Sequence, residues 1–242
     1  MKKIRHQRIM TRGSIQWMIV FSMWMISRCV SMAPVNSSFE SAKTLAKGQM
    51  ELMANYSVYF LKSEDSTGNK VTDEVNNNFG FRLGYGISNR LDLKFRYERM
   101  LPVLREDKDQ LSGINYFALS PRYGIVKNRF TGALDVGLYT YTLKANNARD
   151  QSFFISPRFD FTYPSGKIFD LTLTTKIDIF PSDDKTLWGL NLGCGISSDL
   201  EKWSFRPEIG LMKDLSDFNY SWFTGGAAFV LKFNTLRTTN PK

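Results

Sequence analysis

The stretch GFRLGYGISNRLDLKFRYE, residues 80–98, contains two runs of alternating side chains separated by a short polar break. In the first run, large apolar residues alternate with glycine and Arg82. In the second, they alternate with Asp92, Lys94, Arg96 and Glu98. Because successive side chains of a β-strand point to opposite faces, this period of two predicts a strand, a tight turn and a returning strand, each apolar on one face and polar on the other.

The same period recurs along most of the chain. It predicts ten strands, at residues 48–61, 76–88, 90–100, 113–125, 129–143, 152–163, 167–180, 187–197, 203–212 and 219–233. No stretch of comparable length has the 3.6-residue period of a helix, and no Gly- or Pro-rich linker divides the chain. We therefore expect one all-β domain at 48–233, with a lead-in at 34–47 and a tail at 234–242.

The connections between the predicted strands alternate in length. Those after the first, third and later odd strands are longer, as in KSEDSTGNKVTDEV (62–75), and those after the even strands are short, as in SNR (88–90). Outer-membrane barrels have short periplasmic turns and longer extracellular loops. The pattern predicts a closed, antiparallel, up-and-down transmembrane β-barrel of about ten strands. An even number of strands would place both termini in the periplasm, so we expect the lead-in and the tail to be periplasmic.

The polar face of the predicted strands carries eight basic and eight acidic residues mixed with many glycines. They are Glu51, Arg82, Asp92, Lys94, Arg96, Glu98, Arg122, Asp135, Arg158, Asp160, Asp170, Lys176, Asp178, Arg206, Glu208 and Lys232. Balanced charge and small residues suit a narrow interior, where unpaired charges are costly. We expect these residues to form a paired charge network in the lumen, with the apolar face toward lipid. The alternative is a soluble exported β-calyx that holds an apolar ligand inside.

Residues 1–33 have the pattern of an export signal, with a basic start followed by the apolar run SIQWMIVFSMWMIS. That run is short for a transmembrane helix, although a retained N-terminal anchor is the alternative. Two cleavage sites fit. One follows Ala33, and the other precedes Cys29, which would then be lipidated as in bacterial lipoproteins. Cys194 is the only other cysteine, so loss of the leader excludes an intramolecular disulfide.

The residues needed for common enzyme chemistry are scarce. His6 is the only histidine and lies in the leader, which removes Ser-His and Asp-His mechanisms as well as metal sites built from nitrogen and sulfur ligands. The acidic pairs Asp183/Asp184 and Asp107/Asp109 fall in predicted loops, where solvated surface is the simpler interpretation. We expect no enzyme, cofactor or metal. Outside the leader the charge is nearly balanced, so nucleic acid is not expected as a partner.

A short motif with an arginine beside a proline occurs three times. It occurs in LSPRY (119–123), ISPRF (155–159) and FRPEI (205–209). Proline removes a ladder donor, so we expect bulges or bends at these three sites. The alternative is that Arg122, Arg158 and Arg206 form a basic stripe at one height of the lumen.

FESAKTLAKGQMELMANYSVYF (39–60) resembles the opening segment of small outer-membrane β-barrel proteins of Bacteroidota and related diderm bacteria, in which S-A-[KR]-T-L-x-K-G-x-x-E precedes the first strand. GISNRLDL (86–93) and SPRYGIVKNR (120–129) resemble turns of those barrels, and TGGAAFVLKF resembles a C-terminal barrel signal. The resemblance implies the outer membrane, contact with its lipid, and insertion by the barrel-insertion machinery. That group is largely uncharacterised, so it implies little about function.

A ten-stranded barrel is narrow, and its inward side chains would largely fill it. The sequence therefore favours a non-enzymatic barrel that is structural, binds a protein partner or belongs to an envelope assembly. A small-solute pore or transport-related channel is the alternative.

Overall fold

The computed structural model describes residues 34–64, 70–103, 111–143, 149–216 and 220–235. They form ten strands: β1 (Gln49–Glu64), β2 (Lys70–Gly86), β3 (Leu91–Pro102), β4 (Leu111–Val126), β5 (Phe130–Leu143), β6 (Arg149–Pro164), β7 (Phe169–Phe180), β8 (Lys185–Ile196), β9 (Trp203–Asp214) and β10 (Ser221–Asn234). No helix among these residues is long and apolar enough to cross a membrane.

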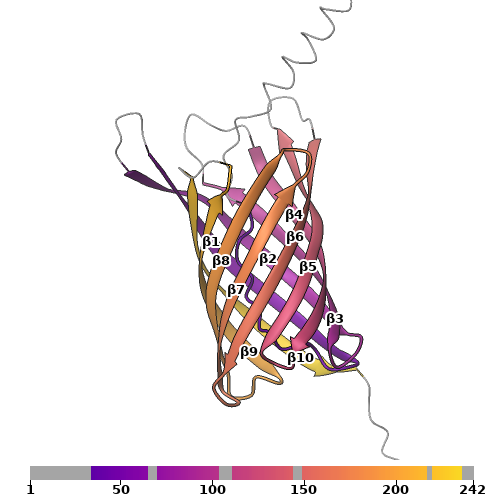
Figure 1. The fold of residues 1–242 in the computed structure, drawn as a ribbon. Coiled ribbons are helices and arrows are strands. Elements are labelled where there is room, and N and C mark those ends of the chain that lie inside the picture. The colour runs from indigo at the N-terminus through magenta and orange to yellow at the C-terminus, as the bar shows by residue number, and fades with distance from the viewer. Residues whose placement is uncertain (1–33, 65–69, 104–110, 144–148, 217–219, 236–242) are drawn as a thin grey trace, which may run out of the picture. The chain divides into compact units, whose positions relative to one another are not determined.

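Each strand pairs with its neighbours in sequence, and β1 also pairs with β10 (Figure 1). The pairing from Gln49↔Asn234 to Lys62↔Ser221 closes the sheet, so the barrel has no free edge along this seam. All pairs are antiparallel. The closed up-and-down barrel of ten strands predicted from the alternation is confirmed.

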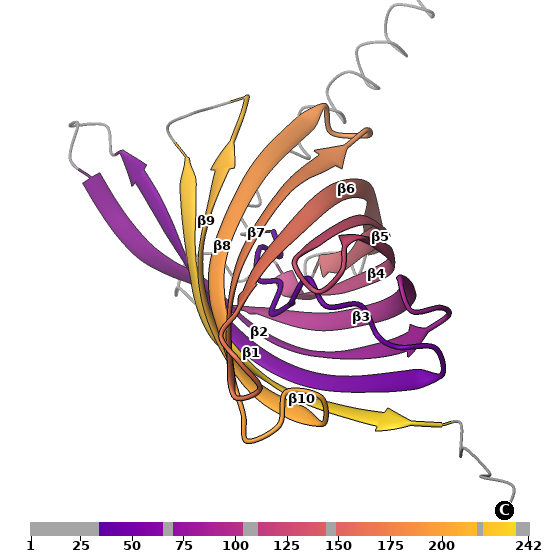
Figure 2. The ribbon, with the colours of Figure 1, turned by 60° about the horizontal axis from the view of Figure 1, so that its bottom comes forward.

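The two ends of the barrel differ. One end, called the turn end below, carries the short connections 87–90, 127–129, 165–168 and 197–202, together with Gly48 and Thr235. The opposite loop end carries the other connections. The predicted long loop 62–75 is wrong in part, because β1 and β2 continue through most of it as a hairpin that projects beyond the neighbouring strands (Figure 2). Val58, Tyr59 and Phe60 lie at its base, where a register shift bends the pair.

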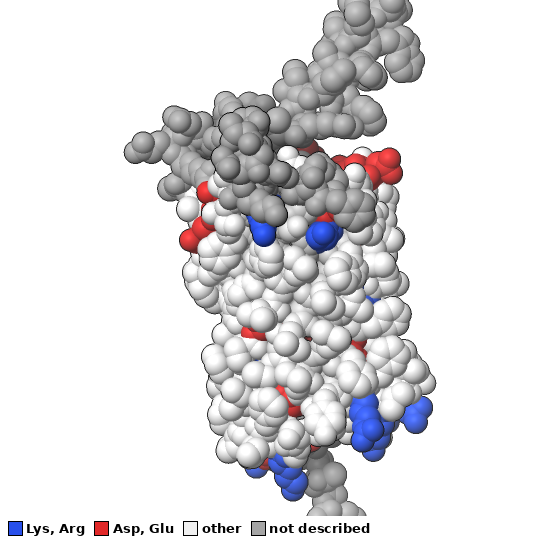
Figure 3. Space-filling model, turned by 60° about the vertical axis from the view of Figure 1, so that its left-hand side comes forward, with Lys and Arg blue, Asp and Glu red and all other residues white. Residues whose placement is uncertain are grey.

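Side chains alternate between an apolar exterior and a polar interior. In β7, Leu173 and Ile177 are about 40% exposed, whereas Thr172, Thr174 and Asp178 are almost fully buried. Figure 3 shows a side surface that is largely free of charge between ends where Lys, Arg, Asp and Glu gather. An apolar surface of this extent is stable in lipid rather than in water. The soluble calyx is therefore wrong, since its apolar face would have to point inward.

The three strand prolines do not produce the predicted bulges. The register is unchanged on both sides of Pro121, Pro157 and Pro207. The ladder instead lacks pairs at these prolines on one side only. The missing pairs are toward β5 at Pro121, toward β7 at Pro157 and toward β8 at Pro207, and the pairs that flank each gap keep the strands aligned. A missing N–H removes one bond without inserting a residue.

Candidate functional site

Residues 34–46, called the lumen segment, run inside the barrel. Its residues from Pro34 to Ala42 are all buried. Val35 lies beside Tyr139, toward the loop end of β5, and Leu45 lies beside Asp92 near the turn end. The segment therefore follows the barrel interior from the turn end toward the loop end, and its trace is visible within the ring of strands in Figure 2. The sequence suggested only a periplasmic lead-in here.

The barrel wall satisfies much of the segment's backbone. Carbonyl oxygens of six segment residues accept hydrogen bonds from lumen side chains: Val35, Asn36, Ser38, Glu40, Ser41 and Ala42. The donors, in the same order, are Lys176, Asn191, Arg82, Arg206, Arg122 and Thr131. Buried main-chain groups need such partners, and this segment has no neighbouring strand to supply them.

Two tyrosines and one carboxylate accept hydrogen bonds from the N–H groups of residues 35–39. Tyr139 accepts from the N–H of Val35 at 3.1 Å, and Tyr59 accepts from those of the next two residues. Glu208 accepts from Ser38 at 2.6 Å and from Phe39 at 2.7 Å. Phe39 itself has a positive φ of 53°, which is uncommon for a residue other than glycine.

Inward glycines give the segment its room. A Cβ at Gly226 would lie 2.9 Å from the ring of Phe39, and one at Gly84 would lie 3.0 Å from Leu45 Cδ1. The Phe39 ring also packs in a small apolar cluster of Met53, Ala228 and Val230. Glycines that weaken their own strands thus open space for the segment.

Glu40 is the centre of charge in the lumen. Its Oε2 lies 2.8 Å from Lys94 Nζ and 2.5 Å from Arg122 Nη1. Its Oε1 pairs with Arg82 Nη1 and lies 4.0 Å from Arg158 Nη2. All five side chains are buried. A buried carboxylate is tolerated when it is paired in this way.

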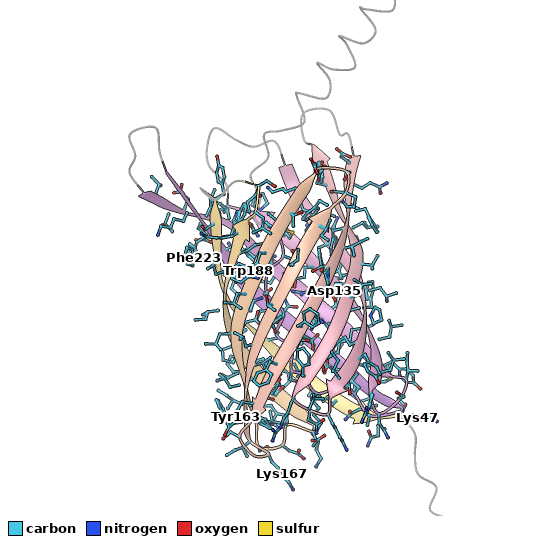
Figure 4. The ribbon with its side chains drawn as sticks, in the orientation of Figure 1. Lys47, Asp135, Tyr163, Lys167, Trp188 and Phe223 are labelled. Carbon is cyan, nitrogen blue, oxygen red and sulfur yellow. The ribbon has the colours of Figure 1, made fainter. Side chains whose placement is uncertain are left out.

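The other charges of the proposed lumen network mostly pair along or between strands. Fifteen of the sixteen residues are buried, and Lys232 is partly buried, with its ammonium 3.3 Å from the carbonyl oxygen of Leu200. The pairs are Lys94–Glu51, Arg96–Glu98, Arg122–Asp92, Arg158–Asp135, Arg158–Asp160, Lys176–Asp178 and Arg206–Asp170. Asp135 lies at mid-height in Figure 4. Glu208, expected in the same network, instead holds the lumen segment.

The arginines of the proline motifs meet at the lumen segment. Arg122 and Arg158 approach the Glu40 carboxylate, and Arg206 donates to the Glu40 carbonyl oxygen at 2.8 Å. They come from β4, β6 and β9 and converge on Glu40, although each also pairs with an acid of the wall.

The candidates for enzyme chemistry are not assembled into a site. Asp183 accepts a hydrogen bond from Ser152, and both Asp183 and Asp184 are exposed at the loop end. His6, Cys29, Asp107 and Asp109 lie outside the described residues. Within the described ranges, no group of three or more His, Cys, Asp and Glu could hold a metal ion. Cys194 is a free thiol.

Sequence reasoning missed Glu40, Tyr59 and Tyr139. Glu40 lies in SSFESA, which has no alternation, so no strand rule assigns it a face. The available signal was indirect: inward glycines such as Gly84 and Gly226 leave room that the segment occupies.

The solved structures that this chain resembles are outer-membrane barrels, and the resemblance is distant. No family model matches, and no curated protein matches. The attachment invasion locus protein Ail of Yersinia pestis is 10% identical, with a TM-score of 0.36, over 77% of this chain and 99% of Ail. An outer membrane channel from Pseudomonas putida F1 is 15% identical, with a TM-score of 0.45, over 84% and 100%. The outer membrane protease OmpT from Escherichia coli is 10% identical, with a TM-score of 0.42, over 80% and 100%. These likenesses are too distant to transfer an activity.

Proposed function

We propose that this protein is an integral outer-membrane β-barrel whose lumen is closed by its own N-terminal segment. In this proposal it is non-enzymatic and serves as a structural or partner-binding component of an envelope assembly. The observation that carries the proposal is the lumen segment itself. The buried backbone of this segment accepts hydrogen bonds from inward side chains of the wall. The carboxylate of Glu40 pairs with cations from β2, β3 and β4.

The turn end faces the periplasm in this proposal, because short turns are typical of that side. Asn234, the last residue of β10, lies at that end, so in this proposal β10 ends on the periplasmic side. Pro34 is buried in the lumen, so a chain cleaved after Ala33 would begin inside the barrel rather than in the periplasm. The export signal and the lipidation of Cys29 stay predictions, which the intact mass of the purified protein tests.

Single-channel recording in planar bilayers tests the closed lumen. We expect the wild-type protein to give no stable open-state current. A variant with both carboxylate anchors removed, Glu40→Ala/Glu208→Ala, should give current bursts, because the segment loses its main ionic and N–H contacts. Stable current through the wild-type protein would contradict the proposal.

A small-solute channel is the second candidate, and one observation favours it. Non-covalent polar contacts and a small apolar cluster hold the segment, which adds no strand to the barrel. Such contacts can be replaced by water if the segment withdraws. In that case the segment would act as a gate, and wild-type recordings would show rare openings whose frequency rises in the double variant.

A further inference from the structure

The cations around Glu40 form a site of defined geometry. Arg82, Lys94, Arg122 and Arg158 belong to β2, β3, β4 and β6, and each side chain is at most 2% exposed. Two of them face each carboxylate oxygen: Arg82 and Arg158 at Oε1, Lys94 and Arg122 at Oε2. The wall thus presents donors in the arrangement that a planar carboxylate requires.

The donors exceed what Glu40 uses. Among the described residues, Nε and Nη2 of Arg158 and Nε of Arg122 are buried without a hydrogen-bond partner. Arg82 has no ion pair with any described acid other than Glu40. Its guanidinium would lose charge compensation if the segment withdrew, and uncompensated buried charge is unfavourable. Arg82 therefore needs another anion when Glu40 leaves, whereas the other three cations keep partners in the wall.

We propose that this cluster is a binding site for a small carboxylate anion, which Glu40 occupies as an internal ligand. The inference rests on the proposed closed lumen and adds the chemistry of the molecule that competes for it. A free carboxylate binds the same two pairs of cations when the segment leaves, and it favours the open state by mass action. Phosphate carries the same charge sign but is tetrahedral and larger, so it fits this planar arrangement less well.

Chemical rescue of Glu40→Ala in the full chain tests the site. Thermal unfolding of the detergent-solubilised protein is followed by circular dichroism in sodium formate, in formamide or in sodium phosphate. Ionic strength is fixed with sodium chloride, whose monatomic anion cannot bridge the two pairs of cations. If formate at ~0.1 M lies near a hundred times its Kd, we expect the Tm of the variant to rise by roughly 5–10 °C. Formamide, with the same shape and no charge, should leave the Tm unchanged.

Wild-type protein and Glu208→Ala are the matched controls. Wild-type protein keeps Glu40 in the site, and Glu208→Ala removes a segment anchor that is held by Ser38 and the Phe39 N–H rather than by arginine. Formate should leave the Tm of both unchanged. An equal effect of formate and formamide, an equal shift in the controls, or a larger effect of phosphate than of formate would overturn the proposal.

If Glu40→Ala does not fold, Glu40→Ser also vacates the position of the carboxylate. Its Tm should then rise with formate more than that of the wild-type protein, and no difference would overturn the proposal. The result is separable from the proposed function. Rescue by formate together with stable wild-type current would contradict the closed lumen and support the anion site. No rescue together with no wild-type current would support the closed lumen and contradict the anion site.

Discussion

At the scale of single residues, Glu40 and Arg82 offer the simplest measure of how the lumen holds its segment. The guanidinium donates to the carboxylate and, through Nη2, to the Ser38 carbonyl oxygen at 2.9 Å. A double-mutant cycle with Glu40→Gln and Arg82→Met should give a coupling free energy of about 0.5–3 kcal/mol, because the pair is buried and in contact. Urea unfolding of the refolded protein measures it.

Arg90 is the control for that cycle. It is exposed in the turn at 87–90, and Arg90→Ala should change the free energy of unfolding by no more than about 0.5 kcal/mol. Additive effects of Glu40→Gln and Arg82→Met would show that the two side chains do not interact in the folded protein.

Two adjacent glycines in β10 give a matched pair of substitutions. A Cβ at Gly226 would lie 2.5 Å from the Tyr56 carbonyl oxygen and 2.9 Å from Phe39, whereas one at Gly225 would have nothing within 4 Å. Gly226→Ala should destabilise the barrel by about 1–3 kcal/mol through overpacking. Gly225→Ala should be neutral or stabilise it by up to about 1 kcal/mol. Equal effects in urea unfolding would contradict the close approach of the lumen segment.

At the scale of elements, the hairpin of β1 and β2 is supported unevenly. Residues Val71–Glu74 pair with β1 alone, since pairing with β3 begins at Asn76↔Pro102. We expect their amides to exchange with deuterium on the order of 100-fold faster than those of 79–85, which pair on both sides. Mass spectrometry of the exchanged protein in micelles measures the two rates. Similar rates would indicate that another element supports the tip of the hairpin.

The elements also show how far sequence reasoning reaches. For β7, alternation predicted a strand at 167–180, and the structure has Phe169–Phe180. The prediction is close because every second side chain of a strand faces the buried interior, so burial itself produces the two-residue period. The lumen segment has no such period, since its partners are side chains from many strands rather than one neighbouring backbone. Glu40 could therefore not be assigned. Bulges were wrongly expected at Pro121, Pro157 and Pro207 because the lost hydrogen bond was treated as an added residue.

At the scale of the whole barrel, interior and exterior depend on each other. The charges that line the lumen pair with one another and with the segment. The outer face of the barrel is almost entirely apolar. Aromatic residues lie toward both ends of that face. Trp188 and Phe223 lie toward the loop end and Tyr163 toward the turn end (Figure 4). Amphipathic aromatic side chains favour the boundary between lipid chains and headgroups, so these two levels mark where the membrane surfaces should lie.

Tryptophan fluorescence tests that placement. Trp222 is 3% exposed and points into the lumen, whereas Trp188 and Trp203 lie partly exposed near opposite ends of the barrel. In single-tryptophan variants reconstituted into vesicles, lipids brominated near the headgroup should quench Trp188 and Trp203 strongly, because heavy-atom quenching requires contact. Trp222 should be little affected, since the wall of the barrel separates it from lipid. Lipids brominated deep in the acyl chain should quench the first two less, because both lie near the surfaces. Strong quenching of Trp222, or protection of the other two, would mean that the polar face rather than the apolar face meets the membrane.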